Sequence, residues 1–147
     1  MSDWQHRYSN LAKEVSTWSK DPSRKIGSVA VGSKGQILAQ GYNGFPRGIL
    51  DTPDRYDDRP TKYKYVVHAE MNVIFNASLN GVSLDGADLY VYGLPVCSEC
   101  AKGIIQVGVK KVFLFIEDDI PLIWLQSWEQ TRGMFDEAGV KYEWIFK

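Results

Sequence analysis

Apolar residues near the start of the chain are spaced first as in a helix and then as in paired strands. Steps of three and four residues predict an amphipathic helix over residues 3–19, which Asp21 and the proline after it would end. The residues that set this spacing are Trp4, Tyr8, Leu11, Ala12, Val15 and Trp18. Two apolar runs at 26–31 and 36–42 flank a Gly-Ser-Lys-Gly turn and predict an antiparallel hairpin.

Beyond the hairpin, helical and strand patterns alternate. Residues 51–64 mix charged residues and prolines with little periodicity, which predicts an irregular surface excursion. In chain order we then expect a helix at 67–79, a strand at 88–92, a helix from about 97, a strand at 110–116, a helix at 121–138 and a strand at 140–146. The expected core residues of the last helix are Leu122, Leu125, Trp128, Met134 and Phe135. This order predicts an α/β fold, a three-layer α/β/α sandwich with a five-stranded mixed sheet.

Length and composition fit one folded domain over residues 1–147. Hydrophobic residues make up 44% of the chain and aromatic residues 13%, which excludes an intrinsically disordered protein. A protein that binds many phosphates is usually basic, whereas the formal net charge here is −1. We therefore expect no duplex nucleic acid as a partner.

The start of the chain and its cysteines bear on where the protein works. The first residues, MSDWQHR, lack the pattern of a signal peptide, and no apolar run is long enough to span a membrane. Two cysteines that bind a metal as thiolates would require a reducing compartment. We therefore expect a cytoplasmic protein with no membrane partner.

Candidate chemistry is concentrated in two short motifs. A His-Ala-Glu sequence at 68–70 opens an apolar run, and Cys97 and Cys100 follow a proline further along the chain. One imidazole and two thiolates make three protein ligands, the number typical of catalytic zinc sites, whereas structural sites have four. The chain has two cysteines and one further histidine, His6, so a closed site would need His6 or a carboxylate as its fourth ligand. The available side chains therefore favour a zinc site with an open position.

Both motifs stand where helices are expected to begin. Cys97 and Cys100 are three residues apart, a spacing that puts their side chains on one side of a helix, and free N–H groups at a helix start favour thiolates. In the first turn of the other helix, Glu70 could lie beside the metal without binding it and act as general acid and base on the water that zinc activates. A redox pair, a structural zinc site or plain buried thiols are the alternatives for the cysteines.

Three further segments add to these motifs and carry a resemblance to a known family. They are SKDPS at 19–23, GYNGFPRG at 41–48, and Thr-Lys-Tyr at 61–63. On these residues and the two motifs, the chain resembles the cytidine deaminase superfamily and, more narrowly, the deoxycytidylate (dCMP) deaminases. That family commonly has proline directly before its first cysteine. Here Val96 intervenes, which predicts a rebuilt turn next to the substrate's amino group.

The resemblance implies a cytidine deaminase-like fold and zinc-dependent conversion of dCMP to dUMP and ammonia. It also implies a homohexamer that dCTP activates and dTTP inhibits, with Mg²⁺ accompanying the triphosphate. Deamination of another cytosine nucleotide or nucleoside, such as dCTP or cytidine, or of a tRNA base, stays open. A non-catalytic module with structural zinc is a further alternative.

The motifs and the resemblance together assign roles to individual residues. Glu70 is the expected catalytic residue, and the expected zinc ligands are His68, Cys97 and Cys100. The resemblance implies substrate contacts from Asn43, Arg24 and Lys25, and effector contacts from Gly44, Phe45, Arg47, Lys62 and Tyr63. For Asn43 the alternative is a turn residue in the left-handed conformation. The aromatic rings at positions 42, 45 and 63 either stack on a base or pack in the core.

Overall fold

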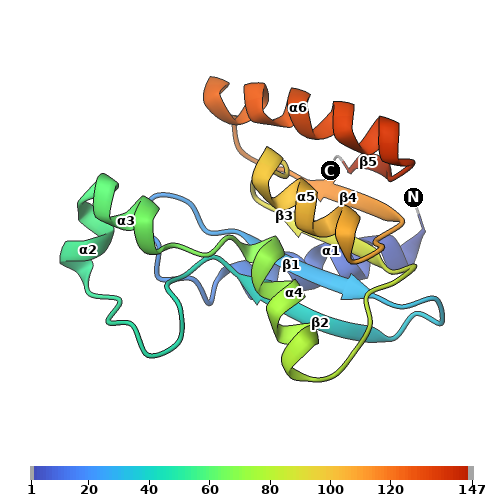
Figure 1. The fold of residues 1–147 in the computed structure, drawn as a ribbon, viewed down its shortest axis with the longest axis horizontal. Coiled ribbons are helices and arrows are strands. Elements are labelled where there is room, and N and C mark those ends of the chain that lie inside the picture. The colour runs from blue at the N-terminus through green and yellow to red at the C-terminus, as the bar shows by residue number, and fades with distance from the viewer. Residues whose placement is uncertain (1, 146–147) are drawn as a thin grey trace.

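The computed structural model describes residues 2–145 and shows a central sheet flanked by helices (Figure 1). The helices and strands, in chain order, are α1 (Asp3–Ser16), β1 (Gly27–Val31), β2 (Ile37–Tyr42), α2 (Pro53–Asp57), α3 (Arg59–Tyr65), α4 (Ala69–Leu79), β3 (Asp88–Tyr92), α5 (Ser98–Gln106), β4 (Lys111–Phe115), α6 (Leu122–Ala138) and β5 (Lys141–Ile145). The predicted α/β fold with a five-stranded mixed sheet is confirmed. Phe146, the predicted end of the last strand, lies outside the described residues.

The sheet has the strand order β2-β1-β3-β4-β5. β1 pairs antiparallel with both β2 and β3, whereas β3, β4 and β5 run parallel to one another. The chain passes from β3 to β4 through α5 and from β4 to β5 through α6. Because parallel strands end at the same edge of a sheet, the segments that lead into α5 and α6 start side by side.

Strand side chains alternate between two cores, one on each face of the sheet. The core on the side of α1 consists of Ala12, Val15, Val29, Val31, Tyr90, Phe113, Phe115 and Ile145. The opposite core includes Ala30, Leu89, Val91, Val112 and Leu114, packed against residues of α4, α5 and α6. β4 is buried at its last four positions, as its nearly continuous apolar run predicted. α4 and α5 therefore share one core on the same face of the sheet.

The prediction for residues 51–64 was wrong about local structure. This segment forms two short helices, α2 and α3, which lie beyond the end of the sheet (Figure 1). Each has a proline in its first turn, Pro53 and Pro60. A backbone N–H at these positions would have no hydrogen-bond partner within the helix, so its absence in proline costs nothing. The prolines thus begin helices here, although their usual effect in a sequence pattern is to indicate a break.

The apolar positions of the two long terminal helices were also predicted only in part. α1 ends at Ser16 rather than near residue 19, and Trp4 and Trp18 are exposed. In α6, Trp128 and Phe135 are buried as predicted, but Leu122 is 69% exposed and Leu125 is 38% exposed. The buried face of α6 follows residues 128, 131 and 135, spaced as i, i+3 and i+7, and the two leucines lie off this stripe. Within residues 2–145, no helix combines the length and apolar character needed to cross a membrane.

Candidate metal centre and active site

The two motifs lie at the starts of α4 and α5. His68 is the N-cap of α4 and Cys97 is the N-cap of α5, both with extended backbone. α4 lies directly on β2 at Gly41, where an added Cβ would come within 2.7 Å of the carbonyl oxygen of Ala69 and 2.6 Å of the amide nitrogen of Val73. Only glycine leaves room for this close approach, which fixes the position of His68 relative to the sheet.

His68, Cys97 and Cys100 bring three ligand atoms within 4.8 Å of one another. His68 Nδ1 lies 3.3 Å from the sulfur atoms of both cysteines. Tetrahedral zinc with bonds of about 2.0–2.3 Å holds neighbouring ligand atoms roughly 3.5 Å apart, so this donor set fits zinc. Among the described residues the group has no fourth protein ligand, and His6 lies in α1 with its Nδ1 next to the Ser2 carbonyl.

The two cysteines are buried and free of a disulfide, and their thiols differ in acidity. A hydrogen bond between the thiols lowers the pKa of Cys97 to about 4 and raises that of Cys100. The Cys97 sulfur also accepts the backbone N–H of Cys100, at the start of α5. The hydrogen bond to Cys97 raises the pKa of His68. Because metals bind the thiolate form, this arrangement favours metal binding at Cys97.

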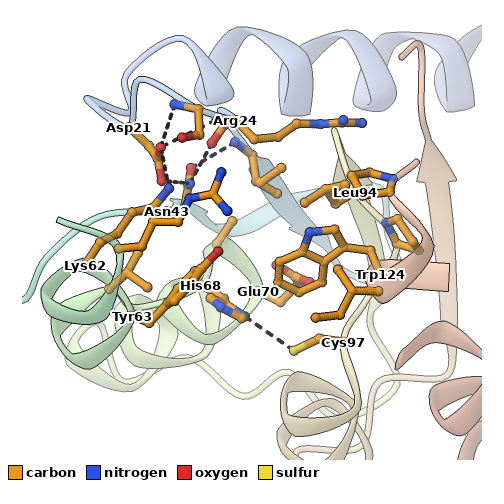
Figure 2. Close-up of a pocket in the computed structure, with 18 residues that line it drawn as sticks. Asp21, Arg24, Asn43, Lys62, Tyr63, His68, Glu70, Leu94, Cys97 and Trp124 are labelled. Atoms are coloured by element: carbon orange, nitrogen blue, oxygen red, sulfur yellow. Dashed lines mark hydrogen bonds and ion pairs between the residues drawn. The ribbon is translucent and has the colours of Figure 1, made fainter. Parts of the chain in front are cut away.

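Glu70 lies in the first turn of α4, and its side chain reaches the same cavity as His68 and Cys97 (Figure 2). The residue is only 4% exposed. Burial raises the pKa of its carboxyl group to about 7, and the neighbouring His68 opposes part of this shift. A carboxyl group with a pKa near neutrality can both accept and return a proton at physiological pH, as general acid–base catalysis requires.

A cavity of about 340 Å³ connects these residues to the loops at the end of the sheet. Figure 2 shows two groups of side chains along it: His68, Glu70, Cys97 and Trp124 at one end, and Asp21, Asn43 and Lys62 at the other. The volume is within the range of about 300–1,000 Å³ that small-molecule sites occupy. We call the first group the metal end and the second group the recognition end.

The recognition end is built around a buried ion pair. Lys62 Nζ lies 2.9 Å from Asp21 Oδ1, and both side chains are almost fully buried. The Asn43 amide donates to the carbonyl of Arg24 at 2.9 Å, and its oxygen accepts the N–H of Ile26 at 2.8 Å. No described residue other than glycine has a positive φ, so the left-handed alternative for Asn43 is wrong. Asn43 therefore joins two loops at the wall of the cavity.

The structure does not bring all of the expected nucleotide contacts to this cavity. Arg24 lines it and donates to the carbonyls of Gly93 and Asp119. Lys25 lines a second, smaller cavity, and its Nζ donates to backbone carbonyls. Arg47 donates to Asn76 on α4.

The expected effector residues are divided between two places. Lys62 and Tyr63 line the same cavity as Glu70. Phe45 instead stacks on Tyr56 with ring centroids 4.4 Å apart, and Gly44 pairs with Val67 through the backbone. The segment at 43–48 thus packs against α2 and against Val67, the residue before His68.

Several residues that line the cavity were not predicted as site residues from the sequence, among them Asp21, Arg59 and Trp124. The Trp124 ring lies edge-on to the His68 ring, with centroids 6.2 Å apart. The available signal for Trp124 was its position just after a buried parallel strand, where ligand sites commonly form. Val96, the residue that departs from the family pattern, is fully buried, and its carbonyl accepts the hydroxyl of Thr131 on α6 at 2.8 Å.

Comparison with known proteins agrees with this geometry. A deaminase of Aliivibrio fischeri, described as uncharacterized and encoded in the luxG 3′ region, is 36% identical over 99% of this chain and 95% of its own length. Human deoxycytidylate deaminase is 38% identical over 95% of this chain and 78% of its own length. The crystal structure of dCMP deaminase from the cyanophage S-TIM5 in complex with dCMP and dUMP superposes with a TM-score of 0.76, at 26% identity, over 99% of each chain.

The family match covers most of the chain and includes both motifs. Residues 2–116 match the protein family described as the cytidine and deoxycytidylate deaminase zinc-binding region. The three clustered ligand atoms at the starts of α4 and α5 are the donor set that such a region requires. The chain is therefore a zinc-binding member of the cytidine and deoxycytidylate deaminase family.

Proposed function

We propose that this protein hydrolyses dCMP to dUMP and ammonia. The observation that carries the proposal is Glu70, a buried carboxyl group that shares a cavity with the zinc ligands His68 and Cys97. Relatives named deoxycytidylate deaminase, and the cyanophage enzyme crystallised with dCMP and dUMP, support dCMP as the substrate. The free thiols suit the reducing cytoplasm in which we propose that the enzyme works.

Glu70 is the residue that moves protons in this reaction. Zinc, when bound, lowers the pKa of a water ligand towards about 7 and so supplies a nucleophile at neutral pH. Glu70 would accept a proton from the attacking water as a C–O bond forms at the amino-bearing ring carbon, and would pass it to the adjacent ring nitrogen. It then carries the remaining proton of the new hydroxyl group to the amino nitrogen. The C–N bond breaks, ammonia leaves, and the oxygen stays on the ring as the new carbonyl of dUMP.

Substrate recognition is proposed to come from the opposite end of the cavity. Asn43 would contact the sugar or the base, and its bonds to Arg24 and Ile26 hold its amide in a fixed orientation. Arg24 would contact the phosphate, since two carbonyl oxygens already fix its guanidinium group at the cavity wall. The substrate contact expected from Lys25 stays a prediction.

Glu70→Gln tests the proposed catalytic role. The variant keeps the size of the side chain but cannot accept a proton, so dCMP turnover should fall about 10²- to 10⁴-fold while zinc content stays at one ion per chain. Glu99→Gln is the matched control, because Glu99 lies between the two cysteines in sequence but is exposed and paired with Lys102. Ammonia release and metal content should be measured on the same samples. Loss of zinc together with activity would show that Glu70 is required for zinc binding instead.

We also propose that dCTP activates and dTTP inhibits the enzyme, each bound with Mg²⁺, through Gly44, Phe45, Arg47, Lys62 and Tyr63 in a homohexamer. Lys62 and Tyr63 border the substrate cavity, so an effector that moved α3 would alter that cavity directly. Phe75 and Leu79 on α4 are 47% and 72% exposed and offer an apolar surface for subunit contacts. Unchanged dCMP turnover with dTTP at saturating Mg²⁺ would contradict the regulation, and a monomer in sedimentation velocity would contradict the hexamer.

A further inference from the structure

The part of the cavity lining outside the metal ligands and Glu70 carries more positive than negative side chains. It includes three cations, Arg24, Arg59 and Lys62, and one acid, Asp21. The chain as a whole has a formal charge of −1, so this excess is a local property of the site. A local excess of positive charge in a concave site favours an anionic ligand.

Two of the three cations already have partners in the protein. Lys62 forms the buried ion pair with Asp21, so its charge is largely balanced. Arg24 donates through Nε and Nη2 to the carbonyl of Gly93 and through Nη1 to that of Asp119. These bonds fix the Arg24 side chain in one place.

Arg59 is different from both. Within residues 2–145, its guanidinium group makes no hydrogen bond, ion pair or ring contact, and the residue is exposed at the cavity wall. Arg59, Lys62, Tyr63 and Val66 all line the cavity, and their i, i+3, i+4 and i+7 spacing puts them on one face of α3 and its C-cap. The helix therefore directs Arg59 towards the cavity, where all five N–H donors are available to a ligand.

We propose that Arg59 is a specificity-determining residue that binds the 5′-phosphate of the substrate and so distinguishes a nucleotide from a nucleoside. This inference rests on the proposed function, because it assumes a deoxycytidine substrate with a phosphate on its 5′ carbon. The planar guanidinium group matches two phosphate oxygens with two parallel hydrogen bonds, a geometry that lysine cannot provide. Arg24 supplies a fixed second positive charge in the same cavity.

Binding of the product separates this inference from catalysis. Titration calorimetry with zinc-loaded protein should compare dUMP with deoxyuridine, which lacks the phosphate. In Arg59→Gln the dissociation constant of dUMP should rise about 10- to 50-fold, whereas that of deoxyuridine should stay within about twofold of wild type. Arg59→Lys should recover only part of the loss, because it keeps the charge but not the paired hydrogen bonds.

Lys64→Gln is the matched control, because Lys64 also lies on α3 and is exposed, and the substitution removes the same positive charge. This variant should bind dUMP as wild type does.

Unchanged dUMP affinity in Arg59→Gln, or equal weakening of dUMP and deoxyuridine, would overturn the assignment. Altered dCTP activation with normal dUMP binding would overturn it as well, by placing Arg59 at the effector. Wild-type protein that neither binds dUMP nor turns over dCMP would remove the proposed function and this inference together, whereas turnover without any dependence on Arg59 would remove the inference alone.

Discussion

The two ends of the cavity are built in different ways. At the metal end, His68 and Glu70 come from one helix start, and Cys97 and Cys100 come from another. At the recognition end, an ion pair joins residues 41 positions apart in the chain, Asp21 in the loop between α1 and β1 and Lys62 in α3. The metal end thus joins two compact local motifs, whereas the recognition end is held by a contact between distant segments. Variants at the two ends should therefore fail in different ways.

Removal of zinc should have the largest effect. Chelation should reduce deamination to background, because the nucleophile is lost, and should lower Tm by about 10 °C, because the metal joins α4 to α5. Far-ultraviolet circular dichroism should change little, since His68, Cys97 and Cys100 all lie outside the strands of the sheet. Zinc added back should restore activity, and Mg²⁺ should not. Full activity in metal-free protein would show that the metal end has been misinterpreted.

Loss of the buried ion pair should come next and should act on stability. Lys62→Met leaves the Asp21 carboxylate buried without its only charged partner among the described residues, which should lower the free energy of unfolding by about 3–5 kcal/mol. Lys102→Met removes an exposed pair with Glu99 and should change it by less than about 0.5 kcal/mol. Urea unfolding of both variants measures the difference. Equal stability of the two variants would mean that the recognition end is not held by this ion pair.

The smallest effect should come from Trp124, the aromatic residue at the metal end. Trp124→Ala removes a ring next to His68 that can stack on a base, so the KM for dCMP should rise about tenfold with little change in kcat. Leu125→Ala, at the exposed neighbouring position, should leave both constants unchanged. Steady-state kinetics of the two variants provides the test. A fall in kcat without a change in KM would place Trp124 in the chemical step.

Local patterns predicted most of the fold because most of its elements carry a simple period. The strand at 88–92 has the predicted bounds, and the other strands differ by at most one residue at each described end. α2 and α3 were missed because the sequence alone does not tell whether a proline begins a helix or breaks one. Here each proline stands in the first turn of its helix. Leu122 and Leu125 were assigned to the core because an apolar side chain does not reveal which face of a helix meets the sheet.

The sequence by itself determined the candidate metal ligands and the neighbouring acid, since each motif holds its residues within one helical turn. The packing of α4 and α5 then brings the two motifs together. The tertiary structure alone decided which cations face the cavity. Lys25 and Arg47 lie elsewhere, and Arg59, which no motif marks, lines it. The physical reason is the distance along the chain over which each structural feature acts. A helix start fixes side chains over three or four residues, whereas the packing of α3 against the loops that carry Asp21 and Asn43 depends on the whole sheet and its cores.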